Sequence, residues 1–137
     1  MKRILFVFVL LCFACKHQKE TFLVKVEAIN GKHEVKISGI DYAILSEINR
    51  DSSKNNWETL APVYKMPIDT DLKNYQPVQP GIYKIVNQAL IFTPDTPFMS
   101  TKSYFLRFYQ FGNNNSIIDY ATGKKKLRAL PYHDFVF

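Results

Sequence analysis

Cysteine, glycine and long apolar runs are scarce in this sequence. Its two cysteines, Cys12 and Cys15, both fall within the first fifteen of 137 residues, so the rest of the chain cannot form a disulfide. Five glycines are too few to favour a Gly-rich loop that cradles phosphate. After residue 15 no segment approaches the roughly 20 apolar residues that a membrane-spanning helix requires. The sequence therefore argues against a disulfide scaffold, a Gly-rich nucleotide-binding enzyme and a transmembrane helix.

Hydrophobic and aromatic residues, by contrast, are plentiful. Hydrophobic residues make up 47% of the chain, with eleven Phe, eight Tyr and one Trp. A disordered chain is poor in such residues, and 137 residues are the length of one domain. We expect one folded domain with a substantial core and no repeat array.

The N-terminus has the three parts of a secretory signal. Met1-Lys2-Arg3 is basic, residues 4–13 carry no charge, and the small Ala14 precedes Cys15. The segment 11–15 (LCFAC) resembles the lipobox of bacterial lipoproteins. That resemblance implies a signal peptide at 1–14, a lipidated Cys15 on a tether at 15–21, and attachment to a bacterial envelope membrane, inner or outer. An ordinary secretory signal, or a short membrane-anchored leader, is the alternative.

The charge balance gives little support to nucleic-acid binding. The formal net charge is +6 for the whole chain, and removal of residues 1–14 takes away Lys2 and Arg3, which leaves +4. A modest excess spread along a chain in the cell envelope predicts no nucleic-acid partner. The one basic cluster, Lys124-Lys125-Lys126 with Arg128, is typical of a solvated turn, although it could also meet anionic lipid headgroups.

Two segments have the pattern of β-hairpins. Residues 22–29 and 32–39 alternate apolar and charged side chains around Asn30-Gly31, a pair typical of a two-residue type I′ turn. The register that this turn predicts places Val26 opposite Val35. Residues 82–86 and 89–93 predict a second hairpin.

Further strands are expected along the rest of the chain, and no helix is expected beyond the leader. A long surface connection is predicted at residues 67–81, which hold three prolines. A strand with two aromatic faces, interrupted by Arg107, is predicted at 103–111, and it should either be central or cover a partner on its outer side. The other predicted strands lie at 42–48, within 57–66, and at 116–120, 127–130 and 132–137. This pattern predicts an all-β sandwich or small barrel over residues 22–137.

Part of the second half resembles bacterial immunoglobulin-like domains. The residues that carry the resemblance are Gly81-Ile82-Tyr83, Leu90-Ile91-Phe92-Thr93-Pro94, Pro97-Phe98 and Tyr104-Phe105-Leu106. In that family a strand ending Phe-x-Pro is followed by a short corner and a Tyr-led strand. The resemblance implies an immunoglobulin-like antiparallel β-sandwich and carries no catalytic residues.

The sequence offers no clear chemistry for catalysis, and we expect a non-enzymatic protein without cofactor or metal. His17, His33 and His133 lack a second ligand at metal spacing. The segment 69–74 (DTDLKN) begins like a calcium loop but lacks its sixth-position Gly and twelfth-position Glu. We therefore interpret its aspartates as turn residues.

A binding or assembly module that contacts an envelope protein or a glycan is the favoured function. Four aromatics could be exposed platforms or core residues, namely Trp57, Tyr64, Tyr75 and Tyr109. A groove lined by Trp57 and Tyr109 would favour a glycan.

Two other functions remain open. Ser38-Gly39-Ile40-Asp41-Tyr42 is similar to the Ser-Gly-x-x-Tyr loop of periplasmic lysozyme inhibitors, which implies Ser38 in an enzyme cleft. A small envelope hydrolase would need two carboxylates in one cleft, within about 10 Å of each other.

Overall fold

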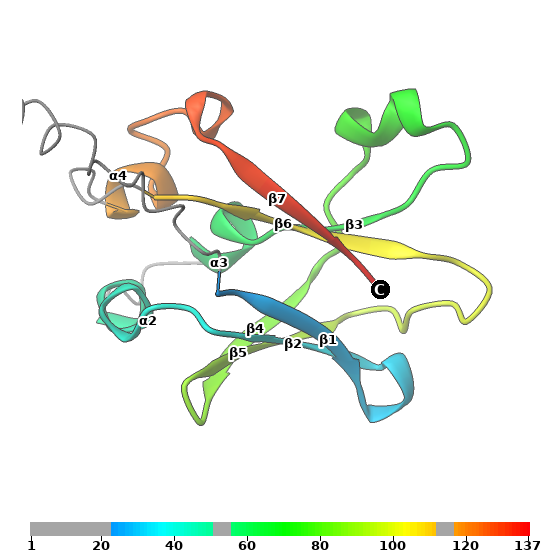
Figure 1. Cartoon of the computed structure of the whole chain (residues 1–137), viewed down its shortest axis with the longest axis horizontal. Coiled ribbons are helices and arrows are strands. Elements are labelled where there is room, and N and C mark those ends of the chain that lie inside the picture. The colour runs from blue at the N-terminus through cyan, green and yellow to red at the C-terminus, as the bar shows by residue number, and fades with distance from the viewer. Residues whose placement is uncertain (1–22, 51–55, 112–116) are drawn as a thin grey trace, which may run out of the picture.

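The described part of the chain is a β-sandwich-like domain made of two antiparallel sheets. The computed structural model describes residues 23–50, 56–111 and 117–137. The two sheets form two layers in Figure 1, with the helices Tyr42–Arg50 and Ile117–Ala121 toward one end. The predicted signal peptide, Cys15 and the tether lie outside the described residues.

Seven strands build the two sheets of the described segments. The four-stranded sheet has the order β1 (Lys25–Ile29), β2 (Glu34–Ser38), β5 (Ala89–Pro94), β4 (Gly81–Val86). The three-stranded sheet has the order β3 (Val63–Lys65), β6 (Tyr104–Tyr109), β7 (Tyr132–Val136). The predictions of a second hairpin, of a strand at the C-terminal end and of a central strand near 103–111 are thereby confirmed.

The core lies between the inner faces of the two sheets. Alternation along each strand sends every second side chain inward. Ile37 and Phe92 come from the four-stranded sheet, and Leu106 from the three-stranded sheet; all three are fully buried. A hydrogen bond links the four-stranded sheet to the segment just before β3, because the Tyr83 hydroxyl on β4 donates to the Ala61 carbonyl at 2.8 Å. Burial raises the pKa of the Tyr83 phenol, so this hydroxyl remains a donor.

The first hairpin exists, but its predicted register is wrong by two residues. Ile29 pairs with Glu34, and residues 30–33 form a longer loop that contains the short 3₁₀ turn η2 (Asn30–Lys32). Asn30 and Gly31 do adopt positive φ, at 51° and 67°. The longer loop keeps the apolar face inward and places Glu27 directly opposite Lys36. Opposite charges in direct register stabilise a sheet, whereas the predicted register opposed like charges.

Two predicted strands are helices, which corrects the all-β expectation. Residues 42–48 lie in α2 (Tyr42–Arg50), and residues 116–120 overlap α4 (Ile117–Ala121). The Asp41 carboxylate caps α2 by accepting from the Ala43 amide at 2.7 Å. Leu45 and Ile48, one turn apart, are buried in the core. Tertiary burial of this apolar stripe thus overrides the β propensity of the segment.

Two smaller corrections concern short segments. The strand predicted within 57–66 is confirmed only for β3, because residues 56–60 form α3 (Asn56–Leu60). The segment predicted as a strand at 127–130 is the 3₁₀ turn η4 (Leu127–Ala129). α4 contacts both α2 and α3, and the helices close one end of the sandwich (Figure 1).

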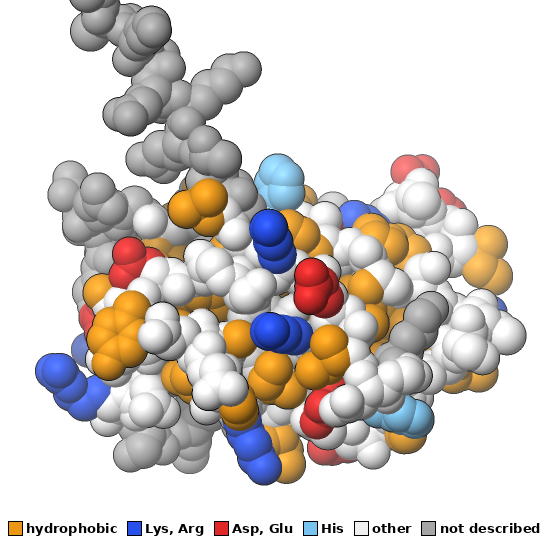
Figure 2. Space-filling model, turned by 60° about the horizontal axis from the view of Figure 1, so that its bottom comes forward, with side chains coloured by type: hydrophobic (Ala, Val, Ile, Leu, Met, Phe, Trp, Pro, Cys, Tyr) orange, Lys and Arg blue, Asp and Glu red, His pale blue; other side chains and the backbone are white. Residues whose placement is uncertain are grey.

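The outer surface of the four-stranded sheet has no single charge. Figure 2 brings this side forward and shows acidic and basic side chains next to one another with hydrophobic ones between them. The Thr93 hydroxyl donates to the Glu34 carboxylate at 3.1 Å across β5 and β2. This mixed surface argues against a strong electrostatic attraction for nucleic acid on this side.

Candidate functional site

The outer face of the three-stranded sheet carries an arginine among aromatic rings. The register of β6 with β7 places Phe105 beside Val136, Arg107 beside Asp134 and Tyr109 beside Tyr132. On the other side of β6, Tyr64 of β3 lies next to Phe105, with the two rings stacked at 5.0 Å. A central strand with two apolar faces requires cover on its outer side. Here that cover is partly polar.

A bidentate ion pair joins the middle of β6 to β7. The Arg107 guanidinium donates through Nε to Oδ1 of Asp134 at 2.8 Å and through Nη2 to Oδ2 at 2.9 Å. Arg107 is 8% exposed, so water competes little for these bonds. Two parallel charge-assisted hydrogen bonds fix the plane of the guanidinium as well as its position.

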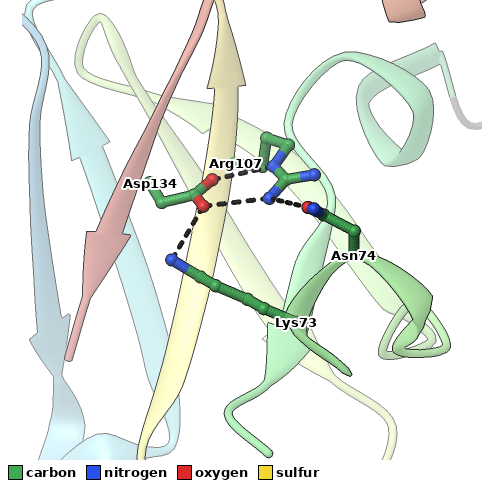
Figure 3. A network of polar contacts seen from close by, with 4 residues as sticks. All are labelled: Lys73, Asn74, Arg107 and Asp134. Atoms are coloured by element: carbon green, nitrogen blue, oxygen red, sulfur yellow. Dashed lines mark hydrogen bonds and ion pairs between the residues drawn. The ribbon is translucent and has the colours of Figure 1, made fainter. Parts of the chain in front are cut away.

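The connection between β3 and β4 supplies two more members of this network. It contains η3 (Thr70–Tyr75), whose first turn is capped by the Asp69 carboxylate, which accepts from the Asp71 amide at 3.0 Å. Oδ1 of Asn74 accepts from Nη2 of Arg107 at 3.0 Å, and Nζ of Lys73 lies 2.8 Å from Oδ2 of Asp134. Figure 3 shows these four side chains converging from η3, β6 and β7. The long surface connection predicted at 67–81 is therefore fastened to the sheet.

Aromatic rings complete the surroundings of the two cations. The guanidinium carbon of Arg107 lies 3.9 Å from the centre of the Tyr132 ring, and Nζ of Lys73 lies 4.6 Å from that of Phe105. Cations over ring faces are stabilised by the ring quadrupole, more so where water is excluded. Arg107 is thus held by a carboxylate, an amide and a ring at once.

The network sets the protonation states in the site. Burial by itself would raise the pKa of the Asp134 carboxyl, but hydrogen bonds from Arg107 and Lys73 outweigh it and hold the pKa below its ordinary 3.8. The hydrogen bond to Asp134 raises the pKa of Arg107. Burial raises the pKa of Tyr109, although Arg107 opposes that shift. At neutral pH the pair is fully ionised and the Tyr109 phenol keeps its proton.

Beside this network the surface is hollowed into a pocket of about 580 Å³, which we call the tyrosine–arginine pocket. Its lining residues are Asn74, Tyr75, Arg107, Tyr109, Arg128 and Tyr132. They include two arginines and three tyrosines but no carboxylate. A volume of this size lies within the range of small-molecule sites. The arrangement can bind a polar ligand by stacking, hydrogen bonding and charge.

The structure separates the two residues predicted to line a glycan groove. Trp57 is 8% exposed and belongs to the core cluster, so its ring offers no open face to a ligand. Tyr109 is half-buried and lines the tyrosine–arginine pocket. Among the residues that the structure describes, Trp57 and Tyr109 therefore do not line a common groove. Of the four aromatics considered, Tyr64, Tyr75 and Tyr109 belong to the site and its rim, and Trp57 is core.

The residues of the inhibitor-like motif are not at the tip of a loop. Ser38 is the last residue of β2, where it pairs with Lys25 of β1. Gly39 follows with φ of 80° and turns the chain toward α2. Tyr42 begins that helix and is exposed. Ser38 in a paired strand lacks the projection needed to enter an enzyme cleft.

Sequence reasoning missed the polar half of the site. Arg107 was visible as an interruption in an aromatic strand, and this was the one signal available. Lys73, Asn74 and Asp134 lie 27 to 34 residues away along the chain. Only the strand order, with β7 beside β6, brings Asp134 to Arg107. Arg128 is exposed, as the prediction of a solvated basic turn expects, and it also lines the pocket.

Comparison with known proteins identifies no relative: no family model, no curated protein and no solved structure matches this chain. Within residues 23–50, 56–111 and 117–137, no three His, Cys, Asp or Glu side chains are grouped to hold a metal ion. No helix in the same segments has the length and hydrophobicity to cross a membrane.

Proposed function

We propose that this protein is a cell-envelope lipoprotein, anchored through lipid on Cys15, that acts as a non-catalytic binding or assembly module. The observation that carries the binding role is the tyrosine–arginine pocket. Its Tyr75 is 82% exposed at the rim, while Arg107 is fixed beneath by Asp134 and Asn74. The fixed position of Arg107 favours binding, because this side chain loses little entropy when a ligand is held.

The chemistry of the pocket favours holding a ligand over transforming it. Arg107 is tied into bonds with Asp134 and Asn74. A general base needs a pKa near the working pH, whereas Asp134 has a lowered pKa and Tyr109 a raised one. The paired carboxylates of a glycosidase are not among the lining residues. These properties support a binding role for this pocket.

The leader supports the anchoring half of the proposal. A basic start, an uncharged stretch and Ala14-Cys15 are the parts that lipoprotein processing requires. Cys15→Ser should leave uncleaved precursor and abolish metabolic labelling with palmitate, whereas Cys12→Ser, the matched control, should change neither. Labelling that persists in Cys15→Ser would refute the anchor.

The binding half has its own test. Full-length protein on its native membrane, treated with a short crosslinker, should capture envelope protein or glycan through the pocket. Tyr75→Ser should reduce that capture, whereas Tyr42→Ser, an exposed tyrosine outside this pocket, should not. Equal capture by both variants would contradict the pocket as the binding site.

The immunoglobulin-like character of the sandwich is also part of the proposal. The segments that carry the resemblance are β4, β5 and the start of β6, with the corner at residues 95–103 between the sheets. Phe98 of that corner packs its ring 4.5 Å from Tyr104, and the Tyr104 hydroxyl accepts from the Met99 amide at 3.1 Å. A Tyr-led strand fixed to the preceding corner supports the resemblance.

A further inference from the structure

We infer that the ligand of the tyrosine–arginine pocket is a carboxylate-bearing sugar. This inference rests on the proposed binding function and names the chemical class of its ligand. Three features of the pocket carry it: an excess of positive charge among its lining residues, exposed aromatic rings at its rim, and hydrogen-bonding groups between the two.

The charge of the pocket calls for an anionic group on the ligand. Arg107 and Arg128 line it without a carboxylate between them. Asp134 forms ion pairs with both Arg107 and Lys73, so this network has one negative and two positive charges. Arg128 adds a further positive charge to the pocket. Arg128 is exposed and has no ion-pair partner among the described residues. A ligand carboxylate at Arg128 would form the bidentate bond that guanidinium geometry favours.

The rings of the pocket call for a flat face on the ligand. Tyr75 is 82% exposed and Tyr132 is 45% exposed, and both line the pocket with Tyr109. Tyr132 is held in place by Arg107 at 3.9 Å and by the edge of Tyr109, whose ring centre lies 6.0 Å from its own. Aromatic faces next to water suit ligands that have one apolar side and polar edges. A pyranose ring has that character.

The polar groups between the rings suit hydroxyls. Asn74 uses its side-chain oxygen toward Arg107, so its amide NH₂ keeps donors for other acceptors. The tyrosine hydroxyls can donate and accept. A bare inorganic anion would make no contact with the rings. An apolar ligand would cover Arg128 and the tyrosine hydroxyls without hydrogen bonds to them, which would lower its affinity.

Calorimetric titration of the full-length lipidated protein in a sugar-free polyoxyethylene detergent tests the inference. The probes are digalacturonate, a disaccharide containing N-acetylmuramic acid, the dimethyl ester of digalacturonate, and sodium acetate. We expect saturable binding of at least one acidic sugar. Binding of the ester should be about tenfold weaker or more, because the charge-assisted bond is lost. Acetate should bind far more weakly than either sugar.

Matched variants locate the binding. Arg128→Gln and Tyr75→Leu should each weaken binding of the acidic sugar by about tenfold or more, and Arg128→Lys should recover part of the loss. Arg50→Gln and Tyr42→Leu, which change exposed residues of α2, should leave binding intact. Unchanged thermal unfolding of Arg128→Gln would show that its loss of binding is not a loss of fold.

Several outcomes would overturn the inference. Binding of neither acidic sugar, equal binding of the ester, or acidic-sugar binding that survives both Arg128→Gln and Tyr75→Leu would each do so. If crosslinked capture from the envelope still depends on Tyr75 in those cases, the binding function stands and only the ligand class is wrong. If that capture is also independent of Tyr75, the proposed function fails as well.

Discussion

Arg107 and Asp134 are direct cross-strand partners on β6 and β7, and their side chains meet through two hydrogen bonds of 2.8 and 2.9 Å. The same carboxylate receives Lys73 from η3 at 2.8 Å. A single acidic side chain therefore holds together three segments that are far apart in the sequence. Its removal should affect both the stability of the sheet and the shape of the tyrosine–arginine pocket.

Asp134→Asn should destabilise the protein by about 2–4 kcal/mol, because a largely buried Arg107 loses its counter-charge and faces an amide donor. Urea denaturation gives the free energy of unfolding. Asp119→Asn is the matched control, since Asp119 lies 3.6 Å from Lys125 in a more exposed pair, and it should cost less than about 1 kcal/mol. Equal losses in the two variants would contradict a dominant role for the Arg107–Asp134 pair.

The contribution of Asp134 should depend on pH in a defined direction. The pKa of Asp134 in the folded protein is lowered below 3.8. Its stabilising effect is therefore fully present at a pH above the pKa of the unfolded chain, and it is lost as the pH falls toward the pKa of the folded protein. The difference in unfolding free energy between the natural protein and Asp134→Asn should be constant above about pH 5 and should shrink below 3.8. A difference that grows on acidification would contradict the assignment.

Gln88→Gly should stabilise the second hairpin. Asn87 and Gln88 turn the chain between β4 and β5 with φ of 49° and 60°, which a glycine adopts without a Cβ penalty. We expect a gain of about 0.5–1 kcal/mol in unfolding free energy. Gln79→Gly is the control, because Gln79 has no positive φ that glycine could relieve. Its backbone N–H donates to the Val63 carbonyl at 2.7 Å, and glycine keeps that donor. That variant should lose stability, and a gain in both would mean that turn geometry is not the cause.

Trp57 should report on the core. It is the single tryptophan of the chain and is 8% exposed, so its fluorescence should be blue-shifted, resist quenching by acrylamide and shift to the red on unfolding. Trp57→Ala should cost about 3–5 kcal/mol, whereas Tyr75→Ala, at an exposed rim, should cost less than about 0.5 kcal/mol. Ready quenching of the folded protein would contradict the core position.

The parts of the fold that sequence reasoning recovered are those governed by local pattern. The turn at Asn87-Gln88 sits between two alternating segments, and β6 has apolar side chains on both faces, as a central strand requires. The strand predicted at residues 42–48 is wrong, because the spacing of Ile44 and Ile48 fits a strand as well as a helix. Asp41, whose carboxylate caps the helix, was the signal that favoured the helix.

The site was less predictable than the fold, for a physical reason. Arg107 and Asp134 become partners only when β7 pairs with β6, and Asn74 reaches them only when η3 lies over the same face. Such pairings are set by strand order and by the path of a long connection, neither of which leaves a periodic trace in the sequence. The aromatic residues were visible as a group, but their separation into core Trp57 and rim Tyr75 depended on the same tertiary arrangement.

Asn74 lines the tyrosine–arginine pocket and also accepts a hydrogen bond from Arg107. Ligand binding in the pocket should therefore stabilise the protein against unfolding. Any molecule that engages Asn74 from the solvent side also opposes the detachment of η3 from β6, so occupancy should slow amide exchange along η3 and raise the melting temperature. Measuring the melting temperature of the full-length protein with soluble envelope fragments would therefore test the proposed envelope partner without a label or an assay of turnover.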